Sequence, residues 1–145
     1  MRKQVSFALA LSMVMTSGMA TVANAAADDG KTNVVFWNSW TGGDGDTLEA
    51  LVNKFNEESD TVHVEMTRTT SFGDMLQTSL PTGEAADLVL LSTNEITRYK
   101  SYLRSMDDIW ENTGLKEEDF SPAYLSMCYN DDTLYAIPFQ ISTYR

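Results

Sequence analysis

The stretch that most constrains the fold is residues 33–55, NVVFWNSWTGGDGDTLEALVNKF. Residues 34–36 form a short apolar run of strong β-formers, which predicts a buried strand. A glycine-rich turn follows at residues 41–45. Asp46 stands where we expect the N-cap of a helix, with Glu49 three residues later as its reciprocal partner. The stretch therefore predicts a strand, a tight turn and a helix.

The helix after this turn is predicted to be amphipathic. Leu48, Leu51, Val52 and Phe55 recur at the spacing of one helical face, which we expect to pack on the protein core. A strand, a turn and a helix open a βαβ unit, and ligands of such sheets bind at the carboxyl ends of the strands. We call this edge the rim, and we expect Trp40 to face it.

Two further strand–helix units follow. Apolar and polar residues alternate at 62–67, which predicts a strand with one polar face, and Ser71 is placed to cap a short helix after it. Residues 87–91, DLVLL, form a continuous apolar run that we interpret as a central parallel strand covered on both faces. Ser92 and Glu95 then form a predicted capping box at the start of another helix.

The C-terminal third is predicted to contain shorter elements. Residues 107–112 indicate a brief helix, and Ser121 followed by Pro122 indicates the start of another. Residues 126–129 and 134–137 flank a polar turn, which is typical of a hairpin. The order of elements predicts an α/β fold in which helices flank a parallel sheet.

The N-terminus is predicted to be a targeting segment. Arg2 and Lys3 precede an apolar stretch that reaches about Val22, and Ala23-Asn24-Ala25 has the small-residue pattern of a signal-peptidase site. We expect residues 1–25 to be a cleaved signal peptide and residues 26–145 to be the exported chain. A membrane anchor is the alternative, but serines and threonines interrupt the apolar stretch.

Composition excludes several classes of function. The formal net charge of −11 and the absence of a basic cluster argue against binding to nucleic acid or anionic lipid. Cys128 and His63 are the only residues of their kinds, so neither a disulfide within the chain nor a histidine–cysteine metal site is expected. We expect no metal, no cofactor and no catalytic residue, with Cys128 acting as a small buried hydrophobe.

The predicted rim combines aromatic, hydroxyl and amide groups. These residues are Trp40, Ser71, Phe72, Thr93 and Asn94. Flat apolar faces beside neutral hydrogen-bonding groups suit a small polar ligand with an apolar face, such as a sugar. Three other interpretations are a phosphate cradle at TGGDGD, a calcium loop begun by Asp44 and Asp46, and acid–base work by paired carboxylates. The first lacks the lysine of a P-loop, the second lacks the remaining ligands, and adjacent carboxylates on a helix diverge.

Four strings in order resemble the N-terminal part of extracellular solute-binding proteins of ABC transporters, in the carbohydrate group that includes maltose-binding and glycerol-3-phosphate-binding proteins. The strings are VVFWNSW, LEALVNKFNEE, TGEAADLVLLST and DDTLYAIPFQIST. The likeness runs from about Asn33 to Arg145. Phe72 stands where some members have a tyrosine, and Ala86 replaces a frequent proline before Asp87.

The resemblance implies a monomeric, non-enzymatic periplasmic receptor that captures a sugar or polyol and delivers it to an ABC permease in the inner membrane. It places ligand contacts at Trp40, Ser71, Phe72, Thr93 and Asn94, and adds Gln140 and Ser142. Family members are several times longer, so the resemblance implies an incomplete N-terminal lobe, a fragment whose second lobe is absent from this chain. The alternative from another class is a fragment of a secreted α/β hydrolase acting on polysaccharide.

Overall fold

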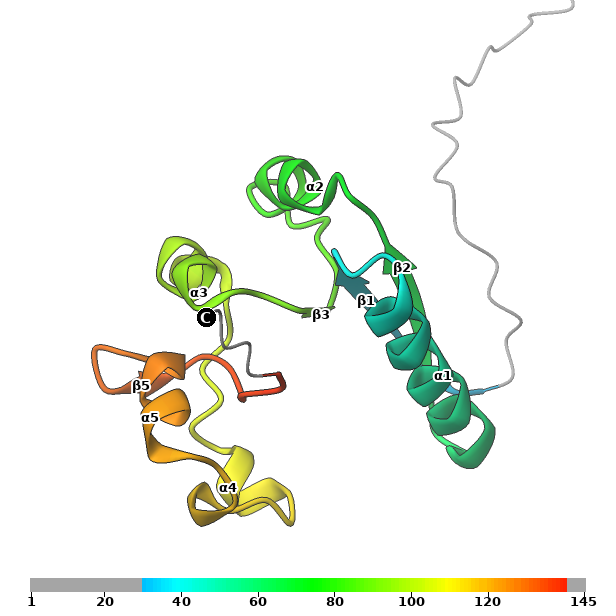
Figure 1. Cartoon of the computed structure of the whole chain (residues 1–145). Coiled ribbons are helices and arrows are strands. Elements are labelled where there is room, and N and C mark those ends of the chain that lie inside the picture. Colours follow the sequence, from blue (N-terminus) through cyan, green and yellow to red (C-terminus); the bar gives the residue numbers. More distant parts are fainter. Residues whose placement is uncertain (1–29, 141–145) are drawn as a thin grey trace, which may run out of the picture.

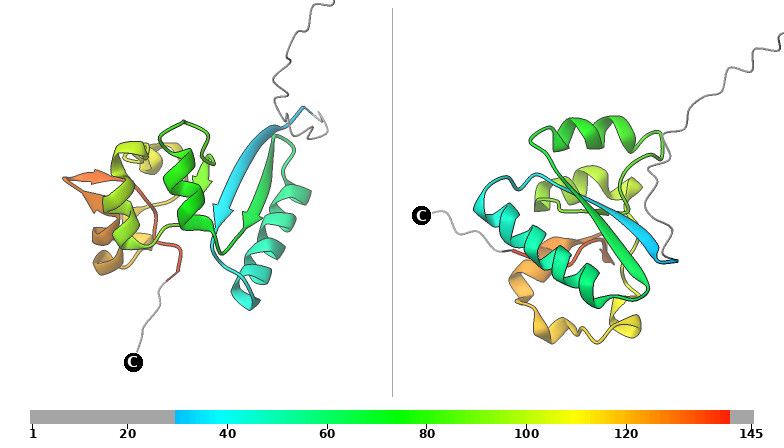
Figure 2. Two further views of the ribbon diagram at one scale, coloured as in Figure 1. Left: turned by 90° about the horizontal axis from the view of Figure 1, so that it is seen from above. Right: turned by 90° about the vertical axis from the view of Figure 1, so that its right-hand side faces the viewer.

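The computed structural model describes residues 30–140, so the expected signal peptide and Ser142 lie outside the described residues. Three parallel strands form the main sheet in the order β2-β1-β3: β1 at Thr32–Asn38, β2 at Val62–Arg68 and β3 at Leu88–Val89. The helix α1, Gly43–Glu58, lies on one face of the sheet, and the helices that follow lie on the other (Figures 1 and 2). The predicted α/β fold with a parallel sheet flanked by helices is confirmed.

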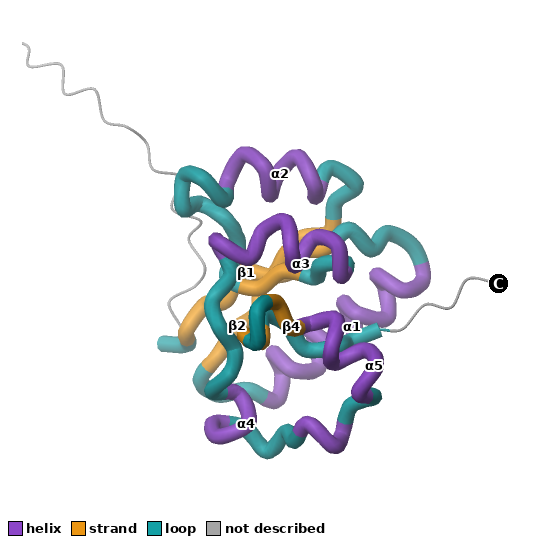
Figure 3. Tube along the Cα trace, turned by 90° about the vertical axis from the view of Figure 1, so that its left-hand side faces the viewer, coloured by secondary structure: helices purple, strands orange, loops and turns teal. Residues whose placement is uncertain are grey.

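Two helices cover the second face of the sheet. They are α2 at Phe72–Ser79 and α3 at Thr93–Tyr99, and a short 3-10 helix, η1 at Lys100–Tyr102, continues α3. Figure 3 shows α2 and α3 next to each other in front of the sheet. Phe72, Leu76 and Tyr99 form the buried cluster that joins these two helices.

The C-terminal elements form a second, separate cluster. They are α4 at Ile109–Asn112, η2 at Glu117–Asp119, α5 at Pro122–Leu125, η3 at Ser126–Cys128, and an antiparallel hairpin of β4 at Tyr129–Asn130 and β5 at Thr133–Leu134. Leu125, Cys128 and Leu134 are buried against Ile96 of α3. The predicted short helices and a hairpin are confirmed. The predicted strand at residues 126–129 is wrong for its first three residues, which form η3, so the hairpin strands are shorter than expected. Cys128 is a buried free thiol, as predicted, and its burial raises its pKa.

Capping was predicted correctly at one helix and wrongly at another. The backbone N–H of Ser92 donates to Glu95 Oε2 at 2.8 Å, which confirms the capping box of α3. The prediction that Asp46 caps α1 is wrong, because the helix begins at Gly43 with Gly42 as N-cap. Gly42 has φ 99°, a left-handed conformation that glycine adopts easily, so the turn enters the helix earlier than the sequence pattern indicated.

One prediction about burial is wrong, and another holds only in part. β3 has only two residues and lies at the edge of the sheet, so it is not a central strand, and Leu88 is 50% exposed. The face of α1 is only partly covered: Leu48 is buried, whereas Leu51 and Phe55 are 55% and 46% exposed. Among residues 30–140, the edge strand β3 and the helix α1 therefore leave large apolar side chains partly uncovered.

Candidate functional site

The predicted rim exists because the three strands are parallel. β1 pairs with β2 along seven residues, so that Asn38 and Arg68 lie opposite each other at the carboxyl end, and Trp37 pairs with Val89 of β3. The loops that leave the strands therefore begin at one edge of the sheet. These loops carry the candidate site.

The structure places the predicted site residues in different environments. Trp40 is half-buried in the loop after β1, while Ser71, Thr93, Asn94 and Gln140 are exposed. Ser71 is the N-cap of α2, and Thr93 and Asn94 open α3. Five of the seven residues thus offer accessible groups in the loops or at the first turns.

Phe72 differs from the other predicted site residues. Its side chain is only 4% exposed and lies in the cluster with Leu76 and Tyr99. The ring of Phe72 is therefore used in packing α2 against α3. A ligand contact by Phe72 stays a prediction, as does each of the other six contacts.

The backbone of Trp40 is held from two sides. Its N–H donates to Oδ1 of Asn38 at 3.0 Å, and Asn38 is completely buried at the end of β1. Its carbonyl lies against Gly45 so closely that a Cβ built on Gly45 would come within 2.3 Å of the Trp40 oxygen. The loop that presents the indole ring is therefore fixed by residues on both sides of it.

Sequence reasoning missed Asn38. Its amide nitrogen Nδ2 is buried and has no hydrogen-bond partner in the structure. A buried polar group without a partner is costly, so such residues often have a role beyond packing. The available signal was a polar residue at the end of an otherwise apolar strand.

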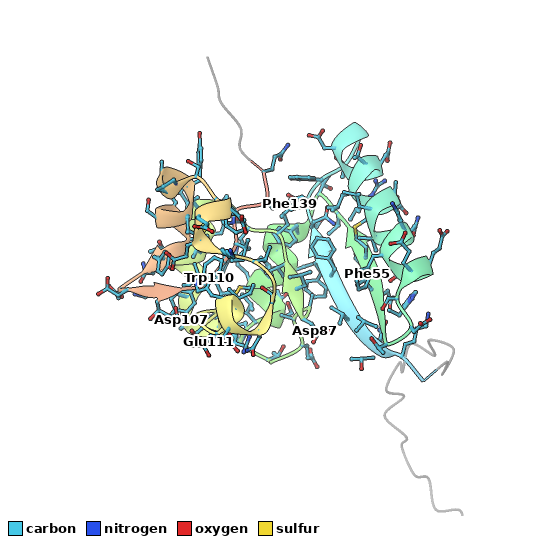
Figure 4. The ribbon with its side chains drawn as sticks, turned by 90° about the horizontal axis from the view of Figure 1, so that it is seen from below. Phe55, Asp87, Asp107, Trp110, Glu111 and Phe139 are labelled. Atoms are coloured by element: carbon cyan, nitrogen blue, oxygen red, sulfur yellow. The ribbon has the colours of Figure 1, made fainter. Side chains whose placement is uncertain are left out.

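Sequence reasoning also missed Phe139. Its ring packs on Trp40, with ring centroids 5.9 Å apart and planes tilted by 36°. Phe139 lies in the segment after β5, between the C-terminal elements and the sheet (Figure 4). No local sequence pattern pairs these two residues, which are far apart along the chain.

The charges beside the rim are paired with each other. Nη1 of Arg68 contacts Oδ1 of Asp46 at 2.8 Å and Oε2 of Glu49 at 3.3 Å. The hydrogen bond that Arg68 donates to Asp46 is the main reason that the pKa of Arg68 is raised, and the negative charge of Glu49 adds to it. Asp46 therefore joins α1 to the end of β2. The sequence pattern had predicted a different role for it, as the N-cap of the helix.

Other kinds of site find little support in residues 30–140. Within this range, no group of three or more histidine, cysteine, aspartate and glutamate side chains could hold a metal ion. None of the described helices has the length and apolar character needed to cross a membrane. An open hollow of about 510 Å³ lies away from the rim, lined by Lys116, Glu117, Glu118, Pro122 and Leu125. Three of these five residues are exposed and charged, so we place the candidate site at the rim.

Three solved structures with a similar fold are named as sugar-binding proteins. The sugar-binding protein MalE from Xanthomonas citri matches 74% of this chain with 22% identity and a TM-score of 0.66. The galacto-N-biose/lacto-N-biose I-binding protein of an ABC transporter from Bifidobacterium longum matches 78% with 21% identity and a TM-score of 0.63. The cyclic α-maltosyl-1,6-maltose binding protein from Arthrobacter globiformis matches 72% with 17% identity and a TM-score of 0.62.

These comparisons establish the fold and its extent. The chain covers 28%, 29% and 27% of the three solved chains, respectively. No protein-family model matches the chain, and a search of curated proteins also finds no match. The described residues therefore have the fold of one part of a lobe found in ABC solute-binding proteins.

Proposed function

We propose that this chain is the N-terminal part of a carbohydrate-binding receptor of an ABC importer. The observation that carries the proposal is the fixed, half-buried Trp40 at the carboxyl edge of a sheet whose fold is shared with sugar-binding proteins. Because the chain spans less than a third of the solved proteins, the rest of the receptor would supply the remaining contacts.

The exposed groups at the rim suit a sugar. Trp40 offers an apolar ring, and Ser71, Thr93 and Asn94 offer neutral donors and acceptors. A sugar presents an apolar face of C–H groups and an edge of hydroxyls, so both kinds of group would find a partner. The same arrangement would also accept a polyol with an extended apolar face.

We propose binding without reaction. Two of the solved neighbours are described with bound lacto-N-biose and bound mannobiose. A glycosidase needs two carboxylates that flank the scissile bond. Asp46 and Glu49 are the carboxylates joined to the end of β2, and both are engaged with Arg68.

The location and partner follow from the same reasoning. We propose that residues 1–25 direct export to the periplasm and are then removed, because they have the charged, apolar and small-residue regions of a signal peptide. An ABC permease in the inner membrane would then receive the sugar. We further propose that the receptor acts as a monomer.

Ligand-observed NMR with maltose, mannobiose and lacto-N-biose tests the proposal on the exported chain. We expect saturable binding in the millimolar range, because half of a two-lobed site would contact the sugar, and we expect each sugar to be recovered unchanged. Saturable binding of none of the three sugars would contradict the receptor proposal. Released monosaccharide would favour the hydrolase alternative.

The Trp40→Ala variant tests the site. We expect sugar binding to weaken more than tenfold, which corresponds to about 1.4 kcal/mol, because the ring would no longer cover the apolar face of the sugar. Tyr102→Ala is the matched control, since Tyr102 is 52% exposed on η1 after the far end of α3. Equal titrations for Trp40→Ala and the unchanged chain would remove Trp40 from the site.

A further inference from the structure

Three large apolar side chains outside the candidate site are only half covered. Leu51 and Phe55 of α1 are 55% and 46% exposed, and Leu88 of β3 is 50% exposed. Single exposed apolar residues are common on protein surfaces, whereas several that share one face indicate a contact surface. The register of the strands and the orientation of α1 show that these three residues do share a face.

Leu88 points to the face of the sheet that α1 covers. It lies opposite Phe36 in the register, and Asn38 lies opposite Arg68. Side chains opposite each other on neighbouring strands, or two residues apart on one strand, point to the same face. Arg68 contacts Asp46 of α1, so this face of the sheet is the one that carries Leu88.

The apolar side of α1 is turned toward β1 and β3. The side chain of Asn56 bonds the N–H of Val64 at 2.7 Å and its carbonyl at 2.9 Å, which fixes one side of the helix to the edge strand β2. Around the helix axis, Asn56 lies about 80° to one side of the buried Leu48, and Leu51 lies about 60° to the other side. Phe55 lies on the same side as Leu51, about 20° from Leu48.

β3 has an open edge next to these side chains. β1 pairs with one edge of β3, and no other strand within residues 30–140 pairs with the second edge. The N–H of Leu90 donates to the carbonyl of Trp37 on β1 at 3.1 Å. Because hydrogen bonding alternates along a strand, the N–H and carbonyl of Val89 lie on the open edge. We call Leu51, Phe55, Leu88 and this open edge the uncovered face.

Charge and chain length limit what can cover the uncovered face. The formal net charge is −11, and Glu84 and Asp87 directly precede β3. A second copy of the chain or an anionic lipid surface would therefore meet charges of the same sign. By contrast, this chain covers only 28% of the solved Xanthomonas citri protein, so most of that protein has no counterpart here.

We propose that the uncovered face binds the part of the receptor that follows Arg145. That part adds a strand to the open edge of β3 and packs apolar side chains on Leu51, Phe55 and Leu88. The added strand pairs the backbone groups of Val89, and the packing removes apolar surface from water. This inference rests on the proposed function and adds the surface through which the two parts of the receptor join.

Thiol labelling of the native protein tests the uncovered face. Leu51→Cys and Leu88→Cys are introduced into the gene, and the protein is purified from the periplasm of its source and treated with a maleimide. Tyr102→Cys is the matched control, because Tyr102 is 52% exposed. The buried Cys128 gives the background rate in the unchanged protein. We expect the thiols at 51 and 88 to react at least tenfold more slowly than the thiol at 102, and all three to react equally in urea.

Hydrogen exchange checks the same surface without a substitution. In the native protein we expect the amide of Val89 to exchange as slowly as the amide of Leu90, which is bonded to β1. Exchange of the Val89 amide at the rate of an unstructured peptide would overturn the added strand.

The intact mass of the native protein separates the two proposals. A protein longer than residues 26–145 in which Leu88→Cys reacts as fast as Tyr102→Cys would overturn the covered face and leave the receptor function standing. A native protein that ends at Arg145 would overturn both the covered face and the proposal that the chain is part of a longer receptor.

Discussion

The sheet region, residues 30–91, and the C-terminal region, residues 92–140, are built around different buried clusters. In the sheet region Leu76 is 1% exposed and packs with Phe72. In the C-terminal region Leu134 is completely buried and packs with Leu125. Both regions also leave large apolar residues about half exposed, among them Leu51 in the first and Met127 in the second. The comparison teaches that the two regions differ in how they are held together: parallel strands with helices form the sheet region, and short helices packed with a hairpin form the C-terminal region.

Polar contacts sharpen this difference. In the C-terminal region the carboxylate of Asp107 accepts the backbone N–H of Leu134 at 2.9 Å, and the N–H of Met106 donates to the carbonyl of Leu134 at 2.8 Å. These bonds hold the hairpin onto the segment before α4. Figure 4 shows Asp107, Trp110 and Glu111 close together, on the opposite side of the view from Phe55. The hairpin turn is closed as well, because Nζ of Lys100 donates to Asp131 at 2.7 Å.

The largest predicted effect comes from a substitution in the buried cluster of the C-terminal region. Leu134→Ala should lower the free energy of unfolding by about 3 kcal/mol, because it removes a fully buried side chain and leaves a cavity. Urea unfolding measures this value. Leu51→Ala is the matched control in the sheet region, and we expect it to cost less than about 1 kcal/mol because Leu51 is half exposed. Equal losses would contradict the difference in burial between these two side chains.

The next prediction concerns a substitution at the rim, outside both buried clusters. Gly45→Ala should destabilise the fold by about 2 kcal/mol, because the new methyl group would collide with the Trp40 carbonyl and force the loop or helix to move. A change in tryptophan fluorescence should accompany the loss. Gly43→Ala, in the same turn, has no atom within 4 Å of its Cβ. We expect that control to be neutral or slightly stabilising, and a similar loss in both variants would contradict the close approach at Gly45.

A smaller effect compares the N-caps of α2 and α3, which belong to different regions. Ser92→Ala should cost about 1 kcal/mol, because the hydroxyl of Ser92 donates to Glu95 at 2.7 Å within the capping box. Ser71→Ala should cost close to nothing, since Ser71 makes no side-chain capping bond. Thermal unfolding of the two variants provides the measurement. A larger shift for Ser71→Ala would reverse our assignment of the caps.

The smallest predicted effect is a dependence on pH in the C-terminal region. Hydrogen bonds from the Ser105 hydroxyl and from the Leu134 N–H lower the pKa of Asp107 below its usual value of 3.8. A carboxylate with a lowered pKa stabilises the folded state above its unfolded pKa, and this contribution disappears as the pH falls through the folded pKa.

We therefore expect Asp107→Asn to unfold more easily than the unchanged chain at pH 6, and expect this difference to shrink below pH 3.8. Urea unfolding at a series of pH values measures it. Glu57→Gln, on the exposed side of α1, is the control for the general loss of one negative charge. If the difference in the free energy of unfolding stays constant down to pH 2, the contribution of Asp107 does not depend on its ionisation.

Much of the fold could be predicted from local patterns. The strand at β1, the glycine turn, the helix after it and the capping box of α3 each depend on residues close together in the chain, so periodicity and side-chain chemistry were sufficient. The rim also followed, because parallel strands place their carboxyl ends at one edge. The predicted start of α1 was wrong because Gly42 adopts a left-handed conformation. The turn contains several glycines, so the sequence does not show which of them has this conformation.

Predicting the candidate site was harder because its contacts join distant segments. Trp40 could be placed at the rim from its position after a strand, but its pairing with Phe139 requires the C-terminal segment to return to the sheet. Phe72 was expected at the rim beside Ser71, yet its ring is buried in the packing of α2 against α3. The seven predicted ligand contacts remain predictions.

The sequence by itself determined the α/β class, the succession of strands and helices along the chain, and the edge where the loops converge. It could do so because hydrophobic period and turn chemistry act over a few residues. Only the tertiary structure decided that β3 lies at the edge, that Arg68 is engaged by Asp46 and Glu49, and that Phe139 packs on Trp40. The physical reason is that the position of a strand within the sheet, ion pairing and ring contacts depend on which distant segments meet. The packing of the whole chain sets that outcome.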